Sequence, residues 1–431
     1  MRLALLGGGG FRVPLVHGAL LTGGDVTELV LHDVDAGRLA AIERVLAEQA
    51  RGVPGAPRVR TTTDLRDALS DVDFVFSAIR VGGLRGRRLD EQVAAAEGVL
   101  GQETVGAGGI AYGLRTVPVA VALARTIAEV APRAWVINFT NPAGMVTEAM
   151  AGVLGERVIG ICDSPVGLCR RVARALGVDP ADARFDYAGL NHLGWLRAVH
   201  VGGEDVLPRL LSDVDGLESF EEGKLFGAGW LRALGVVPNE YLHYYYLARE
   251  AVGGESRGAF LLEQQRSFYA EPSLASWERT RLEREATYMA ETREGEREDL
   301  EGGGYEKVAL ALMRALARGE PTTLILNVRN GSALPGVPAD AVVEVPCEVD
   351  AGGARPFGTG PLPDHALGLV TSVKAVERAV IEAATTGSRE AALRAFALHP
   401  LVDSVSVARR LLDGYVAAHP ELAYLGRQRA E

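Results

Sequence analysis

The sequence has few cysteines, no excess of basic residues and no long uncharged apolar run. Three cysteines in 431 residues exclude the dense disulfide framework of a small secreted domain. The formal net charge of −11, without a basic tract, argues against a nucleic acid or an anionic membrane as the main partner. No uncharged apolar run approaches the roughly 20 residues that span a bilayer, and the start, MRLALLGGGG, lacks the cationic stretch of a signal peptide. We therefore expect a cytoplasmic protein that binds neither nucleic acid nor membrane.

Short apolar runs alternate with helical periodicity through the first 180 residues. Apolar residues make up 48% of the chain, which is enough for large cores. Strands and helices that alternate at this spacing predict an α/β fold with a doubly wound, Rossmann-type parallel sheet. The polar, glycine-rich stretch 80–113 is expected to be a functional loop, because it is too long for a plain connection. Strands are expected at residues 2–6, 26–34, 58–63, 73–79, 134–139 and 157–162, with helices at 36–50 and 115–131.

The pattern changes after about residue 180. FDYAGL and GWLRAVHV are predicted as antiparallel strands, and three helices are expected between residues 364 and 419. Residues 273–300 are mostly charged and helix-favouring, which is typical of a solvated helix. No repeat, low-complexity segment or flexible linker interrupts the chain. We therefore predict two domains, residues 1–180 and 181–431, with a mixed α+β second domain packed closely on the first.

A run of glycines follows the first predicted strand. Such a turn lets backbone N–H groups approach a pyrophosphate at a helix amino end. Asp33 lies 33 − 10 = 23 positions after Gly10, near the spacing of an acid that binds a ribose 2′-hydroxyl, and its charge favours NAD over NADP. The strict GxGxxG pattern is not met, so a tight structural turn is the alternative. The predicted cofactor-binding residues are Gly8, Gly9, Gly10 and Asp33.

Cys162 and His192 are candidate metal ligands that lie far apart in the sequence. A thiolate and a neutral imidazole suit a borderline divalent ion such as manganese, iron, cobalt or nickel. Residue type alone favours a core cysteine and a hydrogen-bonded histidine. The position of Cys162 favours a role as a metal ligand, because the residue ends a predicted parallel strand, at the edge where open α/β sheets bind small molecules.

Two further segments carry polar groups. Asn138 and Asn141 follow the preceding strand and are expected at the same sheet edge, where amides orient sugar hydroxyls or a nicotinamide. The alternative is turn chemistry, since Asn-Pro favours turns. The string NEYLHYYY (239–246) is either a half-buried packing surface or the source of a phenolic base.

Several strings recur together in one family. They are IRVGGLRGRRLDE (79–91), GQETVGAGG (101–109), LRTVP (114–118), NFTNPAG (138–144), GICDSPVGL (160–168), GLNHLGW (189–195) and PNEYLHYYY (238–246), followed by LPDHALGLVTSVKAVE (362–377) and HPLVDS (399–404). In this order they resemble glycoside hydrolase family 4, and most closely its 6-phospho-β-glucosidases. The resemblance covers nearly the whole chain.

This resemblance implies a hydrolysis outside the usual scheme of two carboxylates. Tightly held NAD⁺ removes a hydride from carbon 3 of the sugar, and a divalent metal, expected to be Mn²⁺, polarises the resulting ketone. A base then removes the proton of carbon 2, and the aglycone leaves from carbon 1. Water adds and the hydride returns, so there is no net redox change.

The resemblance also assigns residues by the motifs in which they stand. Cys162 and His192 match the metal ligands, and Tyr241 matches the base. Arg87 and Asn141 match positions that contact the sugar phosphate, and a guanidinium binds phosphate through paired hydrogen bonds.

Two positions depart from the family pattern. Asp163 stands where the 6-phospho-β-glucosidases commonly carry asparagine, and aspartate there resembles the α-specific branch, in which it is the general acid. Asp163 is therefore a candidate catalytic and substrate-binding residue. Glu301 stands where the family often has an arginine before Gly-Gly.

These observations predict an NAD- and Mn-dependent 6-phospho-β-glucosidase with a lactate/malate dehydrogenase-like fold. Residues 1–180 are expected to bind NAD, and residues 181–431 to hold the metal and a phosphorylated sugar. The alternatives are a 6-phospho-α-glucosidase, a lactate/malate-type dehydrogenase and a non-catalytic NAD-binding sensor. Family resemblance also implies a homo-oligomer, a dimer or a tetramer.

Overall fold

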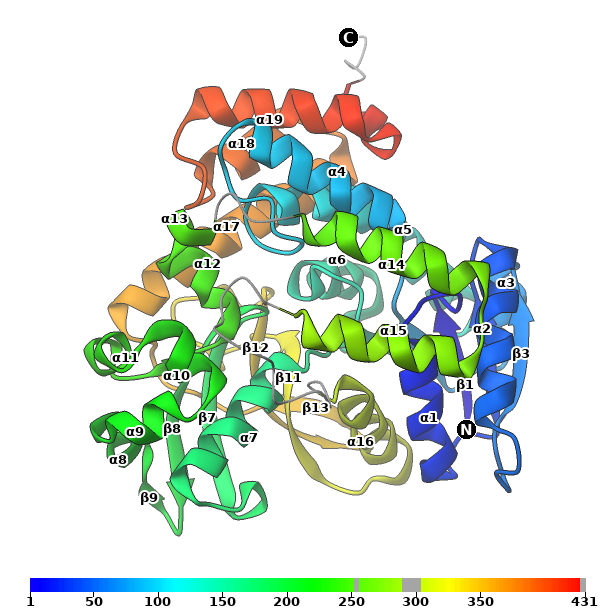
Figure 1. Cartoon of the computed structure of the whole chain (residues 1–431), viewed down its shortest axis with the longest axis horizontal. Coiled ribbons are helices and arrows are strands. Elements are labelled where there is room, and N and C mark those ends of the chain that lie inside the picture. Colours follow the sequence, from blue (N-terminus) through cyan, green and yellow to red (C-terminus); the bar gives the residue numbers. More distant parts are fainter. Residues whose placement is uncertain (252–255, 289–303, 427–431) are drawn as a thin grey trace.

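One sheet of 13 strands organises the chain in this computed structural model, which describes residues 1–251, 256–288 and 304–426 (Figure 1). Its order is β10-β8-β7-β12-β11-β6-β5-β4-β1-β2-β3, with β13 beside β12 and β9 beside β8. The last six strands of this order are mutually parallel and have the Rossmann arrangement 3-2-1-4-5-6. These six are β1 (Arg2–Leu6), β2 (Glu28–His32), β3 (Arg58–Thr62), β4 (Phe74–Ser77), β5 (Trp135–Asn138) and β6 (Val158–Gly160).

Helices cover both faces of this parallel half. In β1, Leu3 and Leu5 pack with α1 and α2, whereas Ala4 and Leu6 pack with α3, α5 and α6 on the opposite face. A strand that is buried on both faces must be apolar throughout, which explains the continuous run LALL. The helices are α1 (Val13–Gly23), α2 (Ala36–Gln49), α3 (Leu65–Leu69), α5 (Gly106–Val130) and α6 (Ala143–Leu154).

The loop predicted at residues 80–113 is wrong over most of its length. Residues 83–96 form α4 (Gly83–Ala96), and α5 already begins at Gly106. Several glycines there serve close packing, since a Cβ on Gly113 would lie 2.4 Å from the sulfur of Met145. Only residues 80–82 and 97–105 connect the elements, and residues 80–82 and 99–103 line the large cavity described below.

The antiparallel half continues the same sheet. β11 joins β6 through the single pair Asn327↔Gly160, and β12 joins β7 through Glu344↔Gly189. The two antiparallel strands predicted after residue 180 are confirmed as the hairpin of β7 and β8. The strands are β7 (Ala183–Leu190), β8 (Leu193–Val201), β9 (Glu204–Asp205), β10 (Val237–Pro238), β11 (Thr322–Arg329), β12 (Val342–Asp350) and β13 (Gly353–Pro356).

Short helices and two longer ones surround this half. α7 leads from the parallel strands into β7, and α16 packs on β11 and β12. The elements are α7 (Ser164–Leu176), α8 (Leu207–Ser212), α9 (Val214–Glu218), α10 (Glu221–Phe226), α11 (Ala228–Leu234), α12 (His243–Tyr246), α13 (Ala248–Ala251) and α16 (Tyr305–Arg318), with the 3-10 helices η1 (Gly155–Arg157), η2 (Pro180–Asp182) and η3 (Glu240–Leu242).

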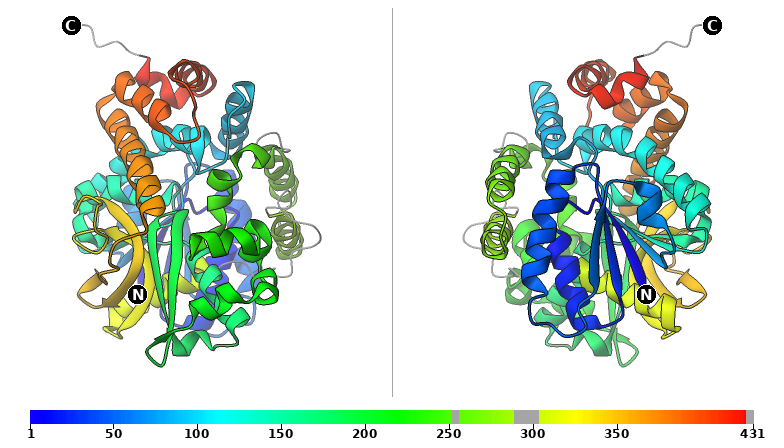
Figure 2. Two further views of the ribbon diagram at one scale, coloured as in Figure 1. Left: turned by 90° about the vertical axis from the view of Figure 1, so that its left-hand side faces the viewer. Right: turned by 90° about the vertical axis from the view of Figure 1, so that its right-hand side faces the viewer.

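The three helices predicted near the carboxyl end are confirmed as α17 (Asp364–Thr386), α18 (Arg389–Leu398) and α19 (Val405–Ala418), followed by η5 (Pro420–Leu425). They share an apolar core with α4 and α5, and they stack above one end of the sheet (Figure 2). Helix α5 has the length and hydropathy of a membrane span, but 83% of its most apolar window is buried inside the fold.

The helix predicted in the charged stretch 273–300 is confirmed over nearly all of its described length, but it is not fully solvated. α15 (Leu274–Ala286) runs beside α14 (Arg257–Ala270), and Trp277 and Thr280 are buried, so the helix is not solvated all round. Glu301 and the rest of the stretch after Tyr288 lie outside the described residues.

The predicted fold class is confirmed. The chain forms a doubly wound Rossmann-type parallel sheet, and antiparallel strands with further helices continue that sheet in the second half. The domain boundary predicted at residues 180 and 181 falls in η2, and the sheet runs across it without a break. The division into two domains stays a prediction.

Candidate active site

A cavity of about 940 Å³ opens along the carboxyl ends of the parallel strands. Parallel strands line it from one half of the sheet and the turn between β7 and β8 from the other, together with η3, α4, α14 and α15. This is the edge at which doubly wound sheets bind ligands. Eight of the residues singled out from the sequence meet here: Gly10, Asp33, Arg87, Asn141, Cys162, Asp163, His192 and Tyr241.

The glycine turn is packed too closely for side chains. Gly7 has a φ of +88°, and a Cβ there would lie 2.4 Å from the carbonyl oxygen of Ala78. Gly8 and Gly9 do not line the cavity; a Cβ on either would lie 2.7 Å from the Cβ of Leu31 or of Arg38, respectively. The turn therefore brings bare backbone to the amino end of α1.

Asp33 follows β2 and fixes the turn. Its Oδ2 accepts the Gly9 N–H at 3.0 Å, and its Oδ1 accepts the Asp35 N–H at 3.1 Å. The carboxylate is half-buried and lines the cavity beside the turn. An acid at this place suits the hydroxyls of a ribose.

Cys162 and His192 come from different halves of the sheet. Cys162 lies just after β6 and is 4% exposed, and His192 occupies the turn between β7 and β8 with a φ of +60°. Thr104 Oγ1 bonds His192 Nδ1 at 2.7 Å, which leaves Nε2 available to a ligand. Burial lowers the pKa of His192 to about 3, so the imidazole is in the neutral form that binds metals.

The surroundings of Cys162 are acidic. Burial raises the pKa of its thiol, and the nearby carboxylates of Glu344 and Asp163 raise it further. Asp163 is half-buried and precedes the first turn of α7. A divalent cation beside these groups would stabilise the thiolate.

The described part of the chain contains no cluster of three His, Cys, Asp or Glu side chains arranged to hold a metal ion. A cation held by Cys162 and His192 would therefore need further oxygen ligands, from substrate or water. Such an open coordination shell is usual for catalytic metals.

Tyr241 stacks on His192. The ring centroids are 3.6 Å apart and the rings are nearly parallel, at 3°. Tyr288 donates a hydrogen bond from its hydroxyl to that of Tyr241 at 3.2 Å. Burial, followed by the charge of Glu240, raises the pKa of Tyr241. One phenol of the aromatic string thus faces the cavity beside the candidate metal ligand.

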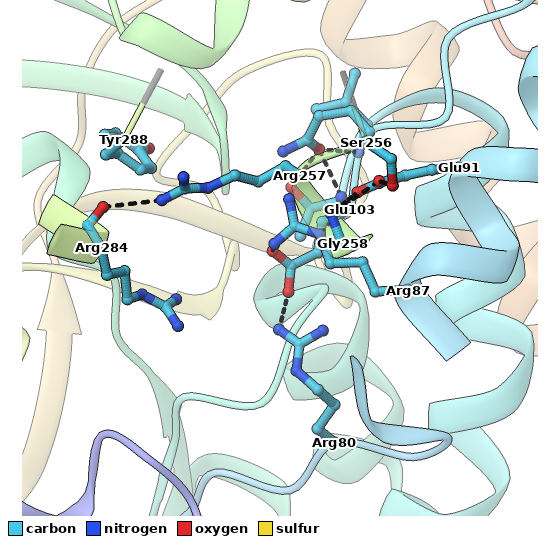
Figure 3. Close-up of polar contacts among 12 residues, drawn as sticks. Arg80, Arg87, Glu91, Glu103, Ser256, Arg257, Gly258, Arg284 and Tyr288 are labelled. Atoms are coloured by element: carbon cyan, nitrogen blue, oxygen red, sulfur yellow. Dashed lines mark hydrogen bonds and ion pairs between the residues drawn. The ribbon is translucent and has the colours of Figure 1, made fainter. Parts of the chain in front are cut away.

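Arg87 belongs to a network of charges on the cavity wall. Its Nη1 donates to Glu103 Oε2 at 2.6 Å and its Nε to Glu91 Oε1 at 2.9 Å. Glu103 also pairs with Arg80, and Glu91 accepts the Gly258 N–H at the start of α14 (Figure 3). Arg87 is therefore held in a fixed position by two carboxylates.

Arg284 stands in no motif of the sequence, yet it belongs to the site. It is half-buried on α15 and lines the same cavity, and its backbone oxygen accepts a bond from Arg257 at 2.8 Å (Figure 3). Burial, and then the charge of Arg12, lower the pKa of Arg284. Within the described residues, its guanidinium has no hydrogen bond or ion pair. An arginine among other cations, without a paired carboxylate, favours an anionic ligand.

Asn141 and the groups that support the site complete the cavity lining. Asn141 Oδ1 accepts the Ala143 N–H at 3.2 Å, so the amide closes a turn and its remaining polar groups line the cavity. Thr104 and Glu240 stand in the strings GQETVGAGG and PNEYLHYYY, but no sequence pattern gives either residue a role. Arg12 follows the glycine turn, and its guanidinium lies over the ring of Tyr305, 5.4 Å from the centroid.

Two models of one protein family match most of the chain. The model of the family 4 glycosyl hydrolases matches residues 4–178, and the model of their C-terminal domain matches residues 187–402. A probable 6-phospho-β-glucosidase of Bacillus subtilis (strain 168) is 34% identical over 99% of this chain and 97% of its own.

Solved structures agree with this assignment. A 6-phospho-β-glucosidase of Thermotoga maritima with NAD and glucose-6-phosphate is 29% identical, with a TM-score of 0.83 over 98% of this chain and 99% of that one. A 6-phospho-α-glucosidase from gut microorganisms with NAD and Mn²⁺ is 28% identical, with a TM-score of 0.83 over 96% and 97%. A malate dehydrogenase of Plasmodium falciparum, 14% identical with a TM-score of 0.54 over 90% of this chain and 99% of that one, shares the fold alone. These matches cover nearly the whole chain, and this chain therefore belongs to glycosyl hydrolase family 4.

Proposed function

We propose that the chain is an NAD- and divalent-metal-dependent hydrolase of 6-phosphoglucosides, acting on the β-anomers. One observation carries the proposal: a single cavity contains a glycine turn with its acid, a thiol and imidazole pair, a phenol and a group of arginines. A simple dehydrogenase needs only the first of these. Relatives that carry the names of 6-phosphoglucosidases support the same substrate class.

The residues present fit a dinucleotide. The glycine turn would admit the pyrophosphate to the amino end of α1, and Asp33 would accept the hydroxyls of the ribose. A 2′-phosphate at this place would meet the charge of Asp33, so NAD is favoured over NADP. The structures of two relatives were determined with NAD.

The residues also fit a borderline divalent cation. Cys162 supplies sulfur, and His192 supplies Nε2 from a ring that Thr104 orients through Nδ1. The acidic groups around Cys162 would be stabilised by a positive charge. Two relatives, a 6-phospho-α-glucosidase and the 6-phospho-β-glucosidase of Thermotoga maritima, were solved with manganese, which supports manganese as the metal.

When bound, NAD⁺ and the cation supply reversible oxidation of sugar carbon 3 and polarisation of the carbonyl formed there. The chain itself would move the protons. Tyr241, held as a phenolate by the positive charge beside His192, would take the proton from carbon 2 through its Oη, and Asp163, in its protonated form, would donate a proton to the departing aglycone oxygen. Stacking on His192 fixes the plane of the Tyr241 ring beside the sugar.

The arginines of the cavity would bind the 6-phosphate. Arg87 is positioned by Glu91 and Glu103, and Arg284 approaches the same space from α15. A phosphate dianion would satisfy the guanidinium of Arg284 and reduce repulsion from Arg12 and Arg257. Asn141, which follows β5 and lines the cavity, would orient a sugar hydroxyl.

We expect Arg284→Met to lower kcat/KM for a 6-phosphoglucoside by about 10- to 100-fold, because one charge-assisted contact is lost. For the glucoside without phosphate, kcat/KM should hardly change. Steady-state kinetics on the two substrates check this. Arg266→Met, which removes an arginine with a 79% exposed side chain, is the control. Equal losses on both substrates would rule out phosphate binding by Arg284.

Asp163 bears directly on whether the α- or the β-anomer is hydrolysed, because 6-phospho-β-glucosidases commonly carry asparagine at this position. We expect turnover of a chromogenic 6-phospho-β-glucoside with NAD⁺ and Mn²⁺, and at least about tenfold slower turnover of the α-anomer. Asp163→Asn should slow substrates with poor leaving groups more than those with good ones, because only the former need a proton donor. Turnover of the α-anomer alone would assign the chain to the α-specific activity instead.

A dehydrogenase or a sensor would differ from the proposed hydrolase in its products. A lactate/malate-type dehydrogenase accumulates NADH as substrate is consumed, and a non-catalytic sensor binds NAD without exchanging hydride. The proposed hydrolase releases sugar phosphate and aglycone with NAD⁺ restored. A cytoplasmic location and a homo-oligomer, dimer or tetramer, stay predictions.

A further inference from the structure

The two candidate metal ligands depend on the places where the two halves of the sheet meet. Cys162 lies two residues after Gly160, whose strand joins the antiparallel half through Asn327. His192 lies three residues after Gly189, whose strand joins β12 through Glu344. Each join is a single residue pair, so backbone pairing alone is a weak constraint on the relative position of the two ligands.

Glu344 connects these segments through its side chain. It is fully buried, at 0% exposed, and its Oε1 accepts hydrogen bonds from Asn327 Nδ2 at 2.9 Å and from Asn191 Nδ2 at 3.1 Å. Its Oε2 accepts the Tyr187 hydroxyl at 3.1 Å. One carboxylate therefore holds β11, β7 and the turn that contains His192.

The packing around these donors leaves little room for other arrangements. A Cβ on Gly160 would lie 2.7 Å from the Cβ of Asn327, and a Cβ on Gly144 would lie 3.3 Å from the Cβ of Asn191. His192 itself has a φ of +60°, a left-handed conformation that is strained for a residue other than glycine and persists only when its surroundings hold it. The bond from Asn191 to Glu344 is one such support.

We propose that Glu344 is a positioning residue for the metal site, which ties the Cys162 segment and the His192 turn together so that thiol and imidazole meet one cation. The inference rests on the metal role proposed above for Cys162 and His192. Thr104 orients the imidazole ring, whereas Glu344 sets the position of the backbone that carries it. Both act through the ligands and neither is itself a ligand.

The test replaces Glu344 with glutamine, which has nearly the same shape. One carboxylate oxygen becomes an NH₂ group. If it faces Asn191 and Asn327, both of those bonds are lost; if it faces Tyr187, that bond reverses and the two amides donate to a neutral oxygen in place of a charged one, so the bonds that hold the turn are weakened in either case. We expect Mn²⁺ affinity, measured by calorimetry, to fall by about 10- to 100-fold, the usual effect of losing an outer-shell partner. With Co²⁺ as probe, the thiolate-to-cobalt absorption band of Cys162 should weaken. NAD affinity should stay within about twofold.

Glu148→Gln is the matched control. Glu148 is a mostly buried carboxylate that accepts the Val342 N–H at 2.8 Å and pairs with Lys374 at 2.9 Å, and it does not line the cavity. Its loss should lower thermal stability and leave Mn²⁺ affinity unchanged. Asn191→Ala, which removes a single donor from Glu344, should weaken Mn²⁺ binding less than Glu344→Gln does.

The outcomes separate this inference from the proposed function. Wild-type protein that binds no Mn²⁺ and shows no thiolate band would contradict the proposed function itself. Wild-type protein that binds Mn²⁺, together with folded Glu344→Gln or Asn191→Ala protein of unchanged Mn²⁺ affinity, would overturn the positioning role. A parallel fall in Mn²⁺ and NAD affinities would also overturn it, because a general loss of structure would then be the cause.

Discussion

Replacing Cys162 with serine is expected to lower kcat/KM by about 10³-fold or more and to abolish the response of the activity to Mn²⁺. A thiolate binds a borderline cation far better than a serine hydroxyl does, since the hydroxyl keeps its proton near neutral pH. The side chain is 4% exposed and serine is smaller, so the fold should survive. Titration of the apoprotein with Mn²⁺ and steady-state kinetics measure the two effects.

Cys169→Ser is the natural control for this variant. Cys169 is equally buried, at 4% exposed, and lies on α7 seven residues further along, but it does not line the cavity. The substitution should cost some stability and leave Mn²⁺ affinity at the wild-type value. If Cys162→Ser protein binds Mn²⁺ as tightly as Cys169→Ser protein does, Cys162 is not a ligand.

Tyr241→Phe is expected to lower kcat by about 10²- to 10⁴-fold, the range of a lost general base. The change removes only the hydroxyl, so the ring can keep its stacking on His192, and NAD and Mn²⁺ affinities should be retained. Exchange of the carbon 2 proton with solvent deuterium should collapse with the turnover. Mass spectrometry of the recovered sugar phosphate measures this exchange directly.

Tyr246→Phe serves as the comparison for the tyrosine variant. Tyr246 belongs to the same aromatic string, but its hydroxyl accepts a hydrogen bond from Trp195 Nε1 at 3.0 Å outside the cavity lining. Its replacement should leave turnover and exchange nearly unchanged. Wild-type rates of carbon 2 exchange in Tyr241→Phe protein would assign the base to another group.

Local patterns predict the parallel half well because its strands are apolar on both faces. Leu3 to Leu6 have no exposed surface, so the run LALL can be read as a covered strand without knowing its neighbours. The loop predicted at residues 80–113 is wrong because glycine occurs both in flexible loops and at close contacts between packed elements. Gly109 and Gly113 allow close contact with Thr104 and Met145 inside a helix, and no local pattern distinguishes this from a flexible loop.

The site is predictable only where a motif carries it. The glycine turn with Asp33 has a known spacing, and Cys162 ends a readable strand. Arg284 lies about 200 residues from Arg87 in the sequence, and a charged helix is normally solvated, so only the packing of α15 across the cavity reveals it. Glu344 is not revealed by its strand VVEVPCEV, because the string has a second glutamate, Glu348, and no local pattern tells the buried carboxylate from the exposed one.

The central claim is that a bond to the aglycone is broken by way of transient oxidation of the sugar, with no net redox change. Hydrolysis of a 6-phospho-β-glucoside in deuterium oxide, with NAD⁺ and Mn²⁺ present, tests it most directly. We predict deuterium at carbon 2 of the released sugar phosphate, with no accumulation of NADH. Product without deuterium at carbon 2, or one NADH formed for each molecule of substrate consumed, would contradict the account.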